Sequence, residues 1–442
     1  MLGLALLVYS CSKTDIYSVD NVRNRGAWFE PSPFGMVYIQ RGAFQLGPSD
    51  DEITDETKMR SVSVDAFWMD DTEITNNEYR QFVYWVRDSI ARKMLGETDP
   101  DFLIADDNRG NPLTTPVINW STRINWRDPD VRLALEDLYF PEEERFSGHR
   151  EIDTRKLVYD YYWIDYKQAA RRVNSYNYNL QKPGYRGVVK NMQGRIDSIR
   201  NRSSFIMHES VAIYPDTLCW IRDFSYSYNE PLTFKYFSHP AFEDYPVVGV
   251  NWNQARAFCN WRTKLSENYR SRMNDAPPHD YRLPTESEWE LASRGTRLDT
   301  KFPWGSYYCR NQQGCFQANF KPLRGNYVSD SETSATTMKV GSFDPNDYGL
   351  YDMAGNVAEW TSSAYFESGY DLANDLNPEV DYMASPDDPP VMKRKVVRGG
   401  SWKDTEYFIR NSTRSYEYLD TTKSYIGFRC VRSSFKNELH NR

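Results

Sequence analysis

The sequence predicts an α+β fold that is rich in loops, with short strands, few helices and a large inserted subdomain. Three observations favour this class. Of the 442 residues, 40% are apolar and 15% aromatic, which indicates a globular domain held together by large, half-buried rings. Several short segments alternate apolar and polar residues, as strands do. Two Thr-x-x-Glu sequences are typical of the capping boxes that begin helices.

The net charge of −8 excludes one class of function. A protein that binds nucleic acid nonspecifically needs an excess of basic residues to neutralise phosphates. This chain has an acidic excess instead, and it is long enough for one large or two ordinary domains. We therefore expect an acidic globular protein.

Residues 1–11 are interpreted as the remnant of a lipoprotein signal. Their apolar run is too short to span a bilayer, and Val8-Tyr9-Ser10-Cys11 resembles a bacterial lipoprotein cleavage box. Lipidation of Cys11 would anchor the protein to a membrane, with residues 12–33 as a polar linker. The alternative is a buried N-terminal strand.

Residues 34–95 are expected to form the first part of the core. Residues 35–39 and 42–47 alternate apolar residues between glycines and predict a hairpin. Residues 61–69 predict another strand. Thr75 and Glu78 then form a capping box, and the helix that follows carries one apolar stripe. This stripe consists of Tyr79, Phe82, Val83, Val86 and Ile90.

Residues 96–244 are interpreted as an inserted subdomain dense in charged and aromatic residues. Residues 131–140 and 155–173 predict amphipathic helices, and residues 204–213 and 218–228 predict strands. Such a segment is too long for a loop. It is either a subdomain packed on its own core or a surface for partners, because exposed Tyr, Trp and Arg often anchor interfaces.

Residues 245–435 are expected to complete the core. Asn251 or Asn253 caps a helix, and Thr285 begins a second capping box whose short helix ends at Gly295. Residues 366–395 are rich in Asp and Pro and predict an exposed insertion before the last strands. The apolar face of the first of these helices is expected to consist of Trp252, Ala255, Phe258, Cys259 and Leu265.

The segment from Asp347 to Ser362 gathers carboxylates, among them Asp352 and Glu359, with an Asn and two glycines around a short apolar run. A tight loop of this composition suits a hard cation, and oxygen ligands fit Ca²⁺ best. The alternative is a carboxylate pair that caps the turn and binds a neighbouring Arg.

Three motifs carry a family resemblance. Residues 349–360, with 282–290 upstream and Gly427-Phe428-Arg429 downstream, resemble the formylglycine-generating-enzyme (sulfatase-modifying factor) family. The resemblance covers about residues 34–90 and 245–433 and implies that family's fold, with two structural calcium sites. One site would use the side chains of Asp352 and Glu359 with the carbonyls of Gly355 and Val357. The other would use Asn319 and the Phe320 carbonyl with Glu332 and the Ser334 carbonyl, Asp330 being a rival ligand.

The resemblance also implies a disulfide between Cys259 and Cys430, since both match positions bridged in the family. The short spacing of Cys309 and Cys315 predicts a second bridge in an oxidising compartment. Cys219 is then left over, and we expect a buried free thiol.

Catalysis in this family depends on copper(I) bound by two cysteines that follow Gly-Gly-Ser. In this chain the matching positions after Gly399-Gly400-Ser401 are Asp404 and Ile409. Neither supplies the soft thiolate that Cu(I) prefers, so we expect no catalysis. A divergent oxidase is the alternative.

Residues 162–166 and 214–220 resemble segments of the lipoproteins of the type IX secretion and gliding-motility machinery. The resemblance implies a protein lipid-anchored on the periplasmic side of the outer membrane, which self-associates into a ring with a GldN- or PorN-type partner and contacts other secretion components. The alternatives are another gliding lipoprotein of the same fold and a lipoprotein that binds a ligand in the former active-site cleft. Arg398, Trp402 and Arg414 could line such a cleft or belong to the core.

Overall fold

The computed structural model describes the chain from residue 30 to residue 435, apart from residues 48–58, 108, 146–147, 180, 274, 298 and 329–332. The lipidation predicted at Cys11 and the ligands predicted at Glu332 and Asp330 lie outside the described residues. Among the described residues, none of the helices has the length and apolar character needed to cross a membrane.

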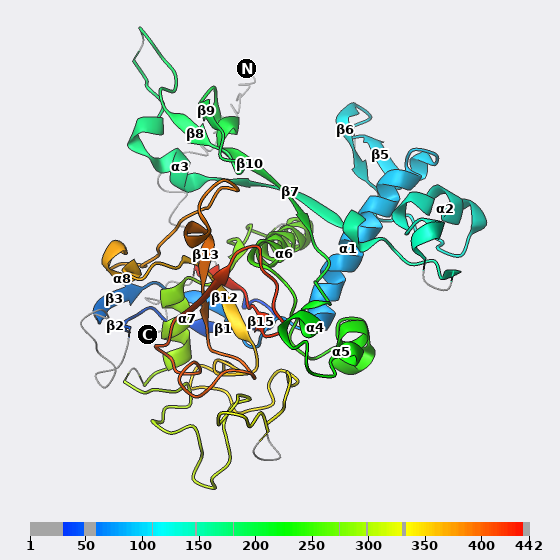
Figure 1. The fold of residues 1–442 in the computed structure, drawn as a ribbon. Coiled ribbons are helices and arrows are strands. Elements are labelled where there is room, and N and C mark those ends of the chain that lie inside the picture. The colour runs from blue at the N-terminus through cyan, green and yellow to red at the C-terminus, as the bar shows by residue number, and fades with distance from the viewer. Residues whose placement is uncertain are drawn as a thin grey trace, which may run out of the picture.

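The fold is mixed α+β with long connecting loops, as predicted (Figure 1). The helices are α1 Asn76–Leu95, α2 Pro129–Ala134, α3 Tyr166–Ala170, α4 Cys219–Asp223, α5 Glu230–Lys235, α6 Trp252–Arg272, α7 Glu286–Arg294 and α8 Gly369–Leu372. The strands are β1 Met36–Ile39, β2 Gly42–Leu46, β3 Arg60–Val64, β4 Phe67–Asp70, β5 Leu103–Asp106, β6 Pro112–Ile118, β7 Val158–Ile164, β8 Val188–Lys190, β9 Ile196–Ser198, β10 Ile206–Ala212, β11 Tyr281–Arg282, β12 Ala358–Ala364, β13 Arg394–Arg398, β14 Ser415–Tyr418, β15 Ile426–Gly427 and β16 Val431–Ser433.

Two four-stranded sheets organise the core. One has the order β1-β4-β16-β11 and is antiparallel, and the other has the order β14-β13-β12-β15, in which β15 runs parallel to β12. In the first sheet, β16 from the end of the chain pairs with β4 from its beginning and with β11 from its middle, whereas the strands of the second sheet all lie between residues 358 and 427. The two ends of the core therefore fold together.

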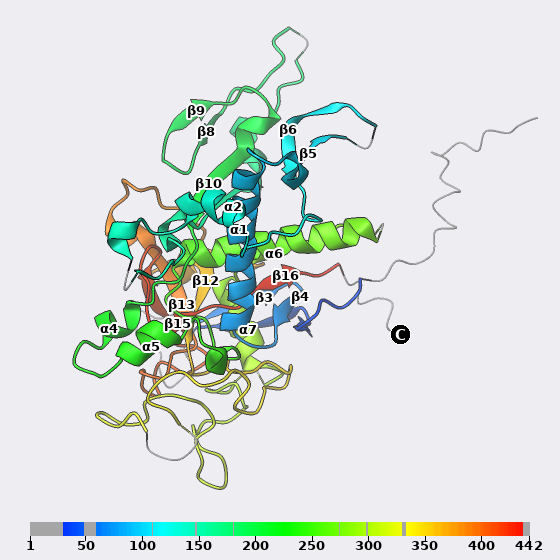
Figure 2. The same ribbon diagram turned by 90° about the vertical axis from the view of Figure 1, so that its right-hand side faces the viewer.

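Helices α1 and α6 cross beside these sheets (Figure 2). Their apolar faces meet in an aromatic cluster, where the rings of Tyr79 and Phe258 stack with centroids 5.6 Å apart. Both helices begin with the capping arrangement expected from sequence, at Thr75 and at Asn251. Leu265 is an exception, because half of its surface is exposed; the prediction that it faces the core is wrong.

The hairpin predicted for residues 35–47 is wrong, although both of its strands exist. Strand β1 pairs with β4, and β2 pairs with β3, in a register that places Phe44 opposite Val62. The strand predicted over residues 61–69 is also divided, because Asp65 and Ala66 separate β3 from β4. Here the Asp65 amide donates to Asn377 Oδ1, so a residue distant in sequence fixes the break.

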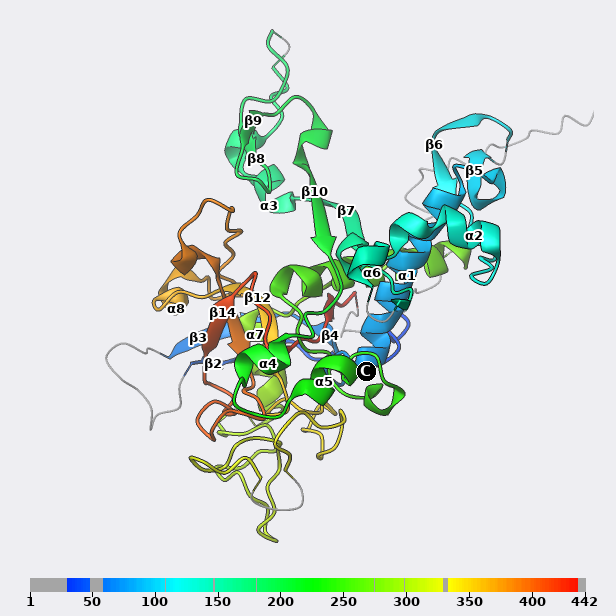
Figure 3. The same cartoon turned by 45° about the vertical axis from the view of Figure 1, so that its right-hand side comes forward.

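Parts of the insertion project away from the two sheets, whereas other parts are buried in the core (Figure 3). The hairpin β7–β10 carries α3, β8 and β9 away from the sheets, whereas Phe102, Tyr159 and Ile213 are buried in the same apolar cluster as α1 and α6. The insertion is therefore not an independent unit.

Two predictions within the insertion are wrong. Residues 155–173 form the strand β7 and the short helix α3, because Tyr159 and Tyr161 alternate with exposed residues at the period of a strand. Residues 218–228 contain the short helix α4 where a strand was expected. The strand predicted over residues 204–213 is present as β10, and the helix predicted over 131–140 is the shorter α2, Pro129–Ala134.

Candidate functional site

The loop that precedes β12 has an unusual backbone. Asp352 and Asn356 adopt positive φ angles of 53° and 57°, and Gly355 adopts 77°. A Cβ atom at Gly355 would lie 2.4 Å from the Asn319 carbonyl oxygen. Only glycine fits there, so this residue lets the loop approach the segment that carries Asn319.

A buried ion pair lies behind this loop. Glu359, at the start of β12, accepts hydrogen bonds from the Arg429 guanidinium at 2.6 to 2.9 Å and from Trp289 Nε1 at 2.8 Å. All three side chains are buried, and each comes from one of the three family motifs. Arg429 also donates to the Tyr351 carbonyl, so the pair connects the loop to the last strands.

Glu73 lies beside this ion pair and belongs to the same buried centre. It was not singled out from the sequence. It is fully buried and accepts hydrogen bonds from Asn356 Nδ2 at 2.8 Å and from the Val357 amide at 3.1 Å. Burial, together with the nearby carboxylates of Asp352 and Glu359, raises the pKa of Glu73 well above its usual value. Its position two residues before the cap of α1 was the available signal.

Asp352 lies at the edge of the same centre. Its Oδ2 accepts a hydrogen bond from the Gly341 amide at 2.6 Å. Burial raises the pKa of Asp352 to about 6, although the Gly341 amide and Arg429 act in the opposite direction. The structure therefore brings Asp352, Glu359 and Glu73 near one guanidinium.

The second predicted calcium site is partly assembled. The buried Asn319 donates from Nδ2 to the Thr336 carbonyl and accepts from the Ser334 amide at 2.9 Å. Phe320 is buried beside it. The structure therefore places Asn319 and Ser334 in contact, and their role as calcium ligands stays a prediction.

The donor types present suit calcium. Arg429 and Trp289 donate hydrogen bonds to both oxygens of Glu359, so a cation would compete with them for this carboxylate. No cluster of three or more His, Cys, Asp or Glu side chains that could hold a metal occurs within the described ranges. The calcium ligands therefore stay a prediction.

One of the two predicted cysteine pairs lies close together in the structure. Cys259 on α6 and Cys430 lie with their sulfur atoms 3.5 Å apart, both as buried free thiols. Cys309 is also a free thiol, and its Sγ lies 4.0 Å from Glu406 Oε2. Both disulfides stay predictions. Cys219 is buried and free, as expected.

The positions of the family's copper-binding cysteines offer no soft ligand. Asp404 accepts a hydrogen bond from Ser401 Oγ at 2.6 Å, and Ile409 is fully buried among aromatic rings. The cavity beside Asp404 has a volume of about 80 Å³. This is far below the range of about 300–1,000 Å³ that is typical of ligand pockets.

The residues suggested to line a cleft belong to the core instead. Arg398 is buried between Glu286 and Glu290, and Arg414 binds Glu286 at 2.6 Å. Trp402 packs against Trp220, with ring centroids 6.1 Å apart. None of the three lines the cavity beside Asp404.

Comparison with known proteins decides the family. A model of the sulfatase-modifying factor enzyme 1-like domain matches residues 29–132 and 150–434. The chain belongs to this family. The matched residues include most of the insertion, which agrees with the burial of part of the insertion in the core of the molecule.

Curated relatives include active and inactive members of the family. The chain is 34% identical over 194 residues to the inactive Cα-formylglycine-generating enzyme 2 of Bos taurus, covering 42% of this chain and 50% of the relative. It is 33% identical over 198 residues to the formylglycine-generating enzyme of the same species, covering 42% and 44%. The chain thus spans about half the length of these relatives. Among solved structures, PvdO from Pseudomonas aeruginosa matches with a TM-score of 0.43 and 16% identity, over 90% of this chain and 94% of that one.

Proposed function

We propose that this protein is a non-catalytic outer-membrane lipoprotein that builds the periplasmic ring of the type IX secretion and gliding machinery. In this role it corresponds to GldK or PorK and assembles with itself, with a GldN- or PorN-type partner and with other secretion components. Reuse of an enzyme scaffold for assembly is common, because function depends on the site and not on the fold.

One observation carries the non-catalytic part of the proposal. The two positions that would bind copper hold Asp404 and the fully buried Ile409. Neither side chain can supply a thiolate to copper or to a substrate cysteine. The existence of inactive relatives is compatible with this interpretation.

The outward face of the β7–β10 hairpin supports the assembly part. Tyr162 and Ile206 are 62% and 46% exposed, and the Tyr162 ring stacks on His208 with centroids 4.6 Å apart. Aromatic and apolar residues on a projecting strand pair are the kind of anchor that interfaces use. We therefore assign the ring contacts to this face and to residues 366–395.

The experiment is recovery of the tagged full chain from native outer membranes, followed by identification of bound proteins and electron microscopy. Deleting the insertion would not test the proposal, because Tyr159 and Ile213 belong to the core. Tyr162→Asp combined with Ile206→Asp changes only the exposed face. We expect this variant to fold and to lose rings and partner.

Tyr308→Asp is the matched control, because this tyrosine is 76% exposed on a different loop. Rings that persist in the double variant would contradict the assigned face. Recovery of no ring partner with the unchanged protein would contradict the function. Capture of a different set of gliding proteins would instead favour GldJ, the other lipoprotein of this fold.

Calcium belongs to the proposal only as a structural ion. Elemental analysis of protein purified in calcium-containing buffer tests it. At least one equivalent of bound calcium would support the predicted ligands around Asp352 and Asn319, and its absence would reject them.

A further inference from the structure

A groove lies where the inserted hairpin meets the core, and neither Asp404 nor Ile409 lines it. It has two chambers, of about 570 Å³ and 340 Å³, which share Lys167, Arg282 and Ser362 as lining residues. Each volume falls in the range of about 300–1,000 Å³ that ligand pockets occupy. We call the whole the junction groove.

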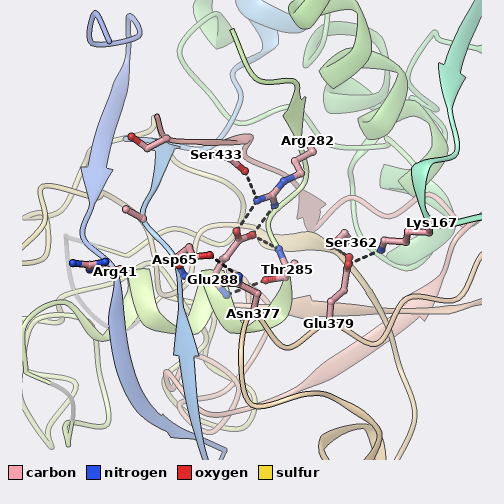
Figure 4. A pocket seen from close by; sticks show the side chains of 12 residues that line it. Arg41, Asp65, Lys167, Arg282, Thr285, Glu288, Ser362, Asn377, Glu379 and Ser433 are labelled. Carbon is pink, nitrogen blue, oxygen red and sulfur yellow. Dashed lines mark hydrogen bonds and ion pairs between the residues drawn. The ribbon is translucent and has the colours of Figure 1, made fainter. Parts of the chain in front are cut away.

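The larger chamber is polar, and its charges are already paired (Figure 4). Arg282 makes a two-pronged ion pair with Glu288 at 2.6 and 2.7 Å. Lys167 binds Glu379 at 2.7 Å, and Asn377 Nδ2 donates to Asp65 at 2.7 Å. A charged ligand would have to displace one of these partners, which is costly.

The smaller chamber is lined by aromatic rings from both sides of the junction. Trp163 and Tyr166 come from the insertion, and Trp252 and Tyr281 come from the core. Cations cover the Trp252 ring, with the Arg256 guanidinium 4.9 Å and Lys395 Nζ 4.1 Å from its centroid. Tyr166 in contrast is 68% exposed, so its ring is available to a ligand.

The charge of the groove disfavours an anionic ligand, because acidic side chains outnumber basic ones. The acidic residues are Asp65, Asp165, Asp280, Glu288, Glu379 and Asp381, and the basic residues are Arg41, Lys167, Arg256 and Arg282.

Sugar hydroxyls both donate and accept hydrogen bonds, so they can bind the remaining lone pairs and N–H groups around these ion pairs without replacing either charged partner. The apolar face of a sugar ring can pack on an exposed aromatic ring. We infer that the junction groove binds a neutral oligosaccharide, with hydroxyls in the polar chamber and one ring on Tyr166.

Binding is measured with the full chain, first on an array of neutral hexose and N-acetylhexosamine oligosaccharides. Calorimetry then uses tetra-N-acetylchitotetraose and cellotetraose as probes, and repeats the titration with the best oligosaccharide of the array. We expect saturable binding to at least one neutral oligosaccharide. Tyr166→Ala should weaken it about tenfold, the loss of one ring contact.

Asn377→Gly tests the polar chamber. Asn377 has a φ of 46°, which glycine tolerates, so the variant removes the amide and keeps the backbone. We expect a loss of severalfold in affinity. Tyr178→Ala is the control, because this tyrosine is 84% exposed elsewhere in the insertion, and it should bind as the unchanged protein does.

The inference is overturned if no neutral oligosaccharide binds, or if all three variants bind equally well. Selection of an extended peptide from a peptide library, with the same dependence on Tyr166 and Asn377, would also overturn it. Ring assembly does not enter these readouts, so failure here leaves the proposed function standing.

Discussion

At the scale of single residues, Gly355 shows how closely the loop before β12 is packed. Gly355→Ala would place a methyl group 2.4 Å from the Asn319 carbonyl, at a φ of 77°. We expect the free energy of unfolding to fall by about 2–4 kcal/mol, as measured by urea unfolding.

Gly314→Ala is the control, because Gly314 also has a positive φ, 89°, but nothing within 4 Å of the added atom. It should cost only about 1 kcal/mol, the backbone strain alone. Equal losses of unfolding free energy in the two variants would show that the contact with Asn319 does not contribute to stability.

Lys395 gives a prediction for pH. It is buried, with Nζ donating to the Ser362 and Tyr382 carbonyls at 3.1 Å, and burial lowers its pKa from 10.5 to about 7. Between these values the unfolded chain binds the extra proton, so stability rises with pH, by up to about 1.4 kcal/mol per pH unit. Urea unfolding at pH 7, 8 and 9 should show this rise.

Lys395→Met removes the titrating group, so its stability should change less over this range. The difference between the two proteins isolates Lys395 from other groups that titrate. Parallel curves for the two proteins would contradict the prediction.

At the scale of elements, α6 and the final strands lie close together at Cys259 and Cys430, whose sulfur atoms are 3.5 Å apart. In oxidised protein we expect a disulfide here, and replacing both by serine should lower the free energy of unfolding by about 2–4 kcal/mol. The loss should be much smaller in reductant. Labelling of both thiols in oxidised, denatured protein would contradict the bridge.

Elements whose signals are local could be predicted from the sequence. The Thr75 and Thr285 capping boxes are present with both reciprocal hydrogen bonds, because a cap depends on residues only three positions apart. Strand partners depend on distant residues, so β1 was assigned the wrong partner. Strand β7 was predicted as part of a helix, whereas its buried Tyr159 and Tyr161 alternate with exposed residues at the period of a strand.

At the scale of the whole molecule, the three family motifs contain residues that meet in the structure, although the sequence did not predict that they meet. Glu359, Trp289 and Arg429 were all within quoted motifs, and the structure joins them in one buried network. The partners of Glu73 and the junction groove could not be predicted, because both arise from segments brought together only by folding.

The central proposal is that this protein does not catalyse formylglycine formation and instead serves in assembly. The most direct measurement is mass spectrometry of a cysteine-containing sulfatase peptide incubated in air with the copper-treated full chain, beside an active formylglycine-generating enzyme. Since Asp404 and Ile409 stand where two thiolates would be needed, we predict that the peptide cysteine stays unchanged. Conversion of this cysteine to formylglycine would contradict the account.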